Sequence, residues 1–93
     1  MHVKVNAFSM IRSILGQNSM QLDLPEGATV RDAIERIIEQ GGPKARNMIL
    51  SPDGKSLKIS VIVNGASVGM DAPLSDGDEM NLMVTIGGGT FLS

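Results

Sequence analysis

Residues 29–43, TVRDAIERIIEQGGP, decide the fold, because they encode one amphipathic helix with a marked start and a marked end. Apolar side chains recur at helical spacing and charged residues lie between them; the apolar positions are Val30, Ile34, Ile37 and Ile38. Thr29 is a favourable N-cap, and the helix dipole favours Asp32 in the first turn. Gly41-Gly42-Pro43 is expected to end the helix, since glycine accepts a left-handed cap and proline cannot continue the helix. The apolar face must pack on another element, and we expect that element to be a sheet.

Two alternating runs before this helix predict an antiparallel pair of strands. Apolar and polar residues alternate over residues 3–8 and again over residues 20–24. The turn residues Gly16-Gln17-Asn18-Ser19 lie between the two runs, and Pro25-Glu26-Gly27 stops the second run. The first part of the chain is therefore expected to form a strand pair that leads into the helix.

Three further strands are expected after the helix. Residues 44–56 are predicted to be irregular, and residues 57–63 are a strongly β-prone run. Asn64-Gly65 is a hairpin signal that returns the chain into a short strand at residues 66–68. Residues 80–86 alternate as the final strand.

This order of elements predicts an α+β domain with a mixed four- to five-stranded sheet and one main helix packed on one face. The first and last strands would be parallel neighbours at its centre, an arrangement called the β-grasp or ubiquitin-like fold. We expect residues 1–86 to form this domain and residues 87–93 to be a flexible, glycine-rich tail. The residues predicted to share one core are Val3, Val5, Leu22, Ile34, Ile37, Ile59, Val61, Leu82 and Val84.

Composition excludes several classes of protein. The chain has 93 residues, of which 42% are hydrophobic and 19% charged, which indicates one small folded domain. It has no cysteine, so disulfides, thiolate metal sites and cysteine nucleophiles are excluded. Tryptophan and tyrosine are absent, which argues against nucleic acid as a partner, because such surfaces stack bases on aromatic rings. No apolar run approaches the roughly 20 residues that span a membrane, so we expect a cytoplasmic protein without a membrane partner.

Charge is distributed unevenly along the chain. Residues 1–60 contain all eight basic residues, whereas residues 61–93 contain no base and the acidic residues Asp71, Asp76, Asp78 and Glu79. An acidic segment of this kind suits a partner with a basic surface. The alternative is that it is merely an acidic turn.

No set of side chains suitable for catalysis or metal binding is evident. His2 is the only histidine, and a cation loop around Asp76, Asp78 and Glu79 would lack its other ligands. Residues 87–90, Gly-Gly-Gly-Thr, lack the lysine and the following helix of a phosphate-binding loop. We therefore expect no enzymatic activity, no metal and no cofactor.

Phe8 and Met83 are candidates for binding a partner. Strand alternation directs both away from the face that the helix covers, and the two strands are expected to be central neighbours. Together they would form an exposed apolar patch, a common mark of a docking site. The alternative is that they are isolated apolar residues of the ordinary kind found on protein surfaces.

Four segments in this order resemble the MoaD/ThiS family of sulfur carriers, and most closely the small subunit of molybdopterin synthase. They are residues 11–16 (IRSILG), 24–32 (LPEGATVRD), 61–65 (VIVNG) and 73–80 (PLSDGDEM). The resemblance covers nearly the whole chain and ends at the glycine run. The segment 43–57 is longer than that of the short thiamine-type carriers, which favours the molybdopterin type.

The resemblance implies a function for the C-terminal segment. An adenylating enzyme of the ubiquitin-activating type, similar to MoeB or ThiF, charges the carboxylate of the terminal glycine pair, which corresponds to Gly88 and Gly89. A sulfur donor then converts it to a thiocarboxylate for molybdopterin or tungstopterin synthesis. Arg12 and Gly87 are expected to contact the partner together with Phe8 and Met83, and the large subunit of molybdopterin synthase would be a further partner.

The sequence departs from this family pattern at its end. Members that act directly end at the glycine pair, whereas this chain continues through residues 90–93, and Val84 and Thr85 stand where the family has two prolines. We expect residues 90–93 to be removed, with a JAMM-type metalloprotease as the processing enzyme. The alternatives are a ubiquitin-like protein modifier and a non-catalytic β-grasp interaction module.

Overall fold

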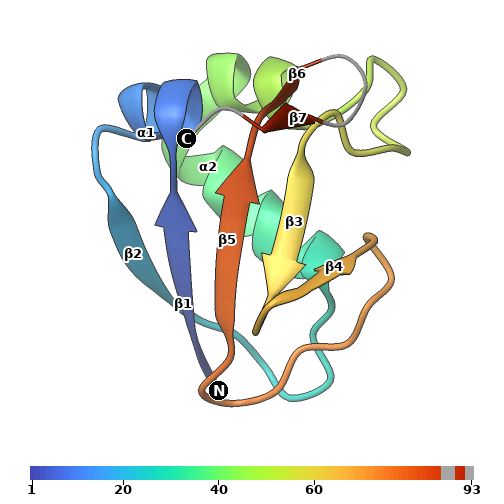
Figure 1. Cartoon of the computed structure of the whole chain (residues 1–93). Helices are drawn as coiled ribbons and strands as arrows, with labels where there is room; N and C mark the ends of the chain where they lie inside the picture. The colour runs from blue at the N-terminus through green and yellow to red at the C-terminus, as the bar shows by residue number, and fades with distance from the viewer. Residues whose placement is uncertain (87–89, 92–93) are drawn as a thin grey trace.

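The secondary structure comprises seven strands and two helices in the part of the chain that the structure, a computed structural model, describes: residues 1–86 and 90–91 (Figure 1). The helices are α1 (Ser9–Leu15) and α2 (Val30–Ile49). The strands are β1 (His2–Ala7), β2 (Ser19–Asp23), β3 (Ser60–Val63), β4 (Ala66–Val68), β5 (Glu79–Met83), β6 (Thr85–Ile86) and β7 (Thr90–Phe91). Five strands form one mixed sheet in the order β2-β1-β5-β3-β4, and α2 crosses one of its faces. The predicted β-grasp fold is therefore confirmed.

The centre of the sheet is the parallel pair β1 and β5. Val5 pairs with Met80 and Ala7 with Leu82, although more than seventy positions separate the partners in sequence. All four side chains are buried under α2. The expected central position of the first and last strands of the domain is thus confirmed.

Helix α2 begins as predicted. The Asp32 carboxylate accepts a hydrogen bond from the Thr29 backbone N–H at 2.9 Å, which satisfies one of the free donors at the helix start. The predicted stop is only half correct. Gly42 breaks the helix with φ 74° and ψ −161°, but Pro43 then starts a second helical segment that continues to Ile49. Proline suits this first position because it has no N–H to satisfy, so the expectation of an irregular segment is wrong for residues 44–49.

Helix α1 was not predicted and replaces a simple turn between β1 and β2. It starts directly after β1, with Phe8 as its N-cap in an extended conformation. Gly16 ends it with φ 76°, and its N–H donates to the Arg12 carbonyl at 2.8 Å. Ile11 is 1% exposed, so this helix contributes to the core in spite of its seven residues.

The core lies between α2 and the inner face of the sheet. Eight of the nine predicted core residues are buried, and the ninth, Val84, is half-buried against them. Residues that the alternation did not assign, Ile11 and Ile49, complete it from α1 and from the second half of α2. No polar or charged residue is buried among the residues that the structure describes.

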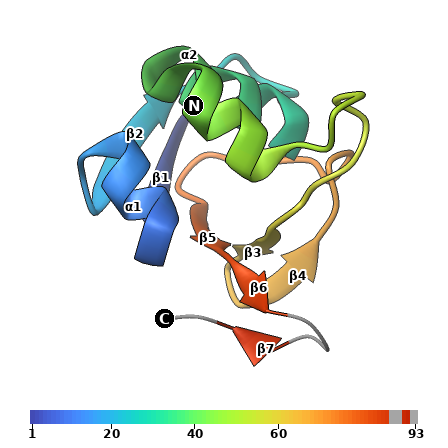
Figure 2. The ribbon, with the colours of Figure 1, turned by 90° about the horizontal axis from the view of Figure 1, so that it is seen from above.

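The last predicted strand is shorter than expected. The Asn64-Gly65 hairpin forms as predicted, with φ 50° and 87° at these two residues. β5, however, ends at Met83, and β6 pairs with β7 in a separate two-stranded ladder. Seen from above, this ladder lies on the side of the sheet opposite to α2 (Figure 2). Gly87–Gly89 lie outside the described residues, so the flexibility of residues 87–93 stays a prediction.

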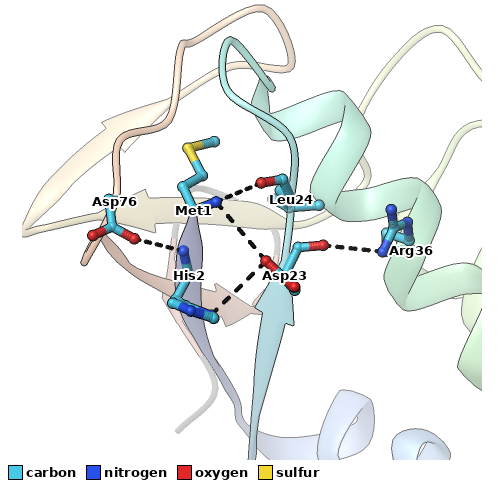
Figure 3. A network of polar contacts seen from close by, with 6 residues as sticks. All are labelled: Met1, His2, Asp23, Leu24, Arg36 and Asp76. Atoms are coloured by element: carbon cyan, nitrogen blue, oxygen red, sulfur yellow. Dashed lines mark hydrogen bonds and ion pairs between the residues drawn. The ribbon is translucent and has the colours of Figure 1, made fainter.

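Polar contacts join the start of β1 to the end of β2 and to the loop before β5 (Figure 3). The Met1 ammonium donates to the Leu24 carbonyl at 2.7 Å, and the His2 backbone N–H donates to Asp76 Oδ1 at 2.7 Å. The Gly77 N–H returns a bond to the His2 carbonyl at 2.8 Å. The loop before β5 is thereby held against the start of β1.

Ile37→Ala should lower the free energy of unfolding by about 2–5 kcal/mol, because a fully buried side chain would leave a cavity under the sheet. Chemical denaturation measures the loss. Glu39→Ala on the exposed face of the same helix is the matched control and should change little. Equal unfolding free energies for the two variants would refute the assigned helix face.

Gly41→Ala should also destabilise the domain, by about 1–3 kcal/mol. A Cβ at this position would lie 2.5 Å from Ala45 Cβ and 2.8 Å from Leu15 Cδ2, so α1 and α2 would have to separate. Gly69→Ala is the control, since a Cβ there has no atom within 4 Å. Thermal melts compare the two, and a Gly41→Ala protein as stable as Gly69→Ala would contradict the close helix contact.

Candidate functional site

Three of the predicted binding residues lie at one end of the molecule. Phe8 follows the last residue of β1 and Met83 is the last residue of β5, one step beyond the pair Ala7–Leu82. Arg12 lies on α1, which begins directly after Phe8, and it is exposed. The chain leaves the sheet after Met83, so these residues surround the point from which the C-terminal segment departs.

Phe8 and Met83 lie on the face of the sheet that α2 does not cover. Both are half-buried, and neither belongs to the core or to the side chains packed against it. Ile62 of β3 lies on the same face, half-buried and outside the core, but one row further from this end, because it pairs with Asn81. Met10 on α1 is 55% exposed. Sequence reasoning missed Ile62, although its place between the inward residues Val61 and Val63 would have indicated an outward side chain.

The outer face becomes polar one row further from this end. Asn6 pairs with Asn81 in register, and the Asn6 Nδ2 amide donates to Asn81 Oδ1 at 2.8 Å and to Glu79 Oε2 at 2.7 Å. Lys4 Nζ lies 3.9 Å from the same Glu79 oxygen. On β1 and β5 the apolar outer surface is therefore confined to the end of the sheet where the C-terminal segment leaves, whereas on β3 Ile62 lies opposite Asn81, in the same row as the two asparagines.

The two ends of the molecule carry opposite charge. Acidic residues gather where β1 and β5 begin, at Asp23, Asp71, Asp76, Asp78 and Glu79. Five of the eight basic residues lie at the other end, on α1, on the second segment of α2 and on the loop before β3: Arg12, Lys44, Arg46, Lys55 and Lys58. The acidic residues that follow Val61 in sequence thus lie far from the exit of the C-terminal segment, which is basic.

Asp53 is the one acidic residue in the sequence from Pro43 to Ser60. Its Oδ1 accepts the Ser51 hydroxyl at 2.6 Å and the Lys55 backbone N–H at 3.0 Å. These hydrogen bonds, the one from Ser51 foremost, lower the pKa of the Asp53 carboxyl. The Asp53 carboxylate is therefore engaged in hydrogen bonds within its own turn.

Other predicted features can be placed as follows. His2 is exposed, with Nδ1 3.9 Å from Asp23 Oδ1. Within the described residues, no group of three or more histidine, aspartate or glutamate side chains is arranged to hold a metal ion. None of the helices in that part of the chain has the length and apolar character needed to cross a bilayer. Gly87, Gly88 and Gly89 lie outside the described residues.

Comparison with known proteins shows one family and several similar structures. The model of the ThiS family matches residues 3–89. The putative molybdopterin converting factor subunit 1 from Pyrococcus furiosus is 31% identical with a TM-score of 0.73, over 88% of this chain and 94% of that chain. A search of curated proteins finds no match.

Two further structures share the fold. SAMP1 from Haloferax volcanii has a TM-score of 0.84 at 24% identity, over 96% of this chain and 100% of that chain. CysO in the BexX/CysO complex of Amycolatopsis orientalis is represented by a structure with a TM-score of 0.70 at 28% identity, over 94% of this chain and 99% of that chain.

Replacing Phe8 and Met83 together by serine should leave the domain folded, because neither side chain packs against the core. The matched control replaces their inward neighbours by serine, as Val5→Ser and Leu82→Ser, and should unfold the domain, since both are fully buried. Circular dichroism and urea denaturation measure both doubles. Unfolding of the Phe8/Met83 double would place these residues in the core and contradict the strand phase.

Proposed function

Because the chain belongs to the ThiS family, we propose that it is a sulfur carrier activated at the backbone carboxylate of Gly89. The observation that carries the proposal is the extent of the family match, which covers residues 3–89 and therefore stops at the second residue of the Gly88-Gly89 pair. Residues 90–93 continue beyond it, and the proposal includes their removal before activation.

The activation chemistry needs no side chain of the carrier. A carboxylate oxygen of Gly89 attacks the α-phosphorus of ATP, pyrophosphate leaves, and an acyl adenylate forms. A sulfur donor then delivers hydrosulfide, whose sulfur attacks the acyl carbon, and AMP leaves as the carbon–sulfur bond forms, which gives the thiocarboxylate without a redox change. Glycines suit this role because a chain without side chains can enter a narrow channel, and residues 87–89 are all glycine.

The described end of the sheet supports docking to an activating enzyme. Phe8 and Met83 supply half-buried apolar surface next to the exit of the C-terminal segment, and Ile62 adds to it one row further in. Contact there would hold the carrier while the glycines extend to the nucleotide, and Arg12 and Gly87 would flank the contact. The partner is an adenylating enzyme of the MoeB or ThiF type, and the processing enzyme is a JAMM-type protease.

Molybdopterin or tungstopterin synthesis is the pathway that we propose. It rests on the 31% identity to the putative molybdopterin converting factor subunit 1 from Pyrococcus furiosus. The large subunit of molybdopterin synthase would then receive the thiocarboxylate. The likeness to SAMP1, a modifier protein, keeps conjugation to other proteins as the second candidate.

ATP–pyrophosphate exchange with the adenylating enzyme from the same genome tests the activation step. Protein truncated after Gly89 should support exchange, whereas protein that keeps residues 90–93 should not, because the Gly89 carbonyl is then in a peptide bond to Thr90. Truncation after Gly88 should abolish exchange, since the carboxylate would stop roughly 3.5 Å short of the α-phosphate. Equal exchange rates for the protein that keeps residues 90–93 and the protein truncated after Gly89 would show that removal of residues 90–93 is not needed for activation.

Intact mass of the protein from its native source tests the product. Loss of residues 90–93, with the mass increase of an oxygen-to-sulfur exchange, is the expected result. Isopeptide remnants of Gly89 on lysines of other proteins, without a thiocarboxylate form, would favour the modifier. A native protein that keeps Ser93 and gives no exchange when truncated would favour the interaction module instead.

A further inference from the structure

A groove lies between α1, the second segment of α2 and the segment before β3, away from the outer face of the sheet. Its volume is about 500 Å³. The apolar walls are Ile14, Met48, Ile59 and Val84. Lys44, Asn47 and Lys58 line the rest of it, and all three are exposed. We call it the Lys44–Lys58 groove.

One of its two ammonium groups is held in place. Lys58 Nζ donates to the Asn47 carbonyl at 2.7 Å, and that carbonyl belongs to the last turn of α2. A cation is favoured at a helix C-terminus, where unpaired carbonyls carry partial negative charge. An ammonium has three N–H donors, so this bond leaves two for an incoming acceptor.

The surroundings of the groove are also basic. Arg46 and Lys55 lie on the same helix segment and loop, and the single carboxylate of this region, Asp53, is bound to Ser51 and Lys55. An occupant that combines an apolar side chain with a carboxylate would match both the walls and the rim. An apolar occupant without charge would leave the lysines unused, and a purely anionic one would leave the apolar walls in water.

We infer that the Lys44–Lys58 groove receives an acidic peptide segment of the adenylating enzyme, with one apolar side chain placed between Ile14, Met48 and Val84. The inference rests on the proposed function. Val84 connects the two, because it lines the groove and directly follows Met83, the last residue of β5. The C-terminal segment therefore begins beside this groove, and a partner that takes it up comes close to the groove.

Charge reversal tests the carboxylate contact. The measurement is exchange kinetics against the concentration of carrier truncated after Gly89. Lys44→Glu with Lys58→Glu should raise KM about tenfold with kcat unchanged, because rim charges act on association more than on chemistry. The matched control, Arg31→Glu with Arg36→Glu, makes the same charge change at the start of α2 and should leave KM within a factor of about two. Added salt should reduce the difference in KM between the two double variants, because it screens the charges.

Filling the groove tests the apolar contact. Asn47→Trp places a large ring in the groove from an exposed position and should raise KM, whereas Gln40→Trp, also exposed on α2, should not. Denaturation curves check that all variants fold.

Four outcomes would overturn the inference. If the parent protein supports exchange and both charge-reversal doubles have the same KM, the groove is not a docking site, but the proposed function stands. A concentration-dependent dimer that is abolished by Asn47→Trp, with KM unchanged, would assign the groove to a second copy of the chain. If the parent protein binds single-stranded RNA and the Lys44/Lys58 double variant loses that binding with KM unchanged, the groove is a nucleic-acid surface. Absence of exchange by the parent protein would end the inference together with the proposed function.

Discussion

The parallel pairing of β1 with β5 is the constraint on which the rest of the structure depends. It joins residues from opposite ends of the domain, with Val5 against Met80 and Ala7 against Leu82. Because parallel strands end on the same side, the exit of β1 into α1 and the exit of β5 into the C-terminal segment must be neighbours. Phe8 and Met83 meet at that exit for this reason, although each is specified by a different part of the sequence.

Strand periodicity then divides the side chains of β1 and β5 between two faces. The inward set is entirely apolar and is covered by α2, which makes the register hard to shift, since a slip by one residue would expose it. The outward side chains are not held in the core. Along the two strands they change from Lys4 and Glu79 through the Asn6–Asn81 pair to Phe8 and Met83. The outer surface at Phe8 and Met83, where we propose that a partner docks, is therefore built on strands that the core already holds in register.

The sequence predicted the elements whose signals are local and periodic. The stripe of α2, the alternation of β1 and β5 and the Asn64-Gly65 turn each contain enough residues to be recognised. Helix α1 has only seven residues, and its position depends on packing Ile11 into the core, which no pattern within the segment reveals. The helical segment after Gly42 was missed because glycine and proline do end a helix, but proline is also the favoured first residue of the next one. The groove was unpredictable for the same reason, since Lys44, Asn47 and Met48 lie on that segment.

The distribution of charge shows why order along the chain is a poor guide to the surface around its end. The acidic residues from Asp71 to Glu79 are near the C-terminal segment in sequence, but β5 carries the chain from them to the opposite end of the sheet. Asp76 instead accepts a hydrogen bond from the backbone N–H of His2, which holds the loop against β1. The charged residues nearest the exit come from α1, the second segment of α2 and the loop before β3, and all but Asp53 are basic. Under the proposed function, an activating enzyme with an acidic docking surface would therefore be attracted to this cationic end, and the attraction would orient the protein with its C-terminal segment towards the enzyme before contact is made.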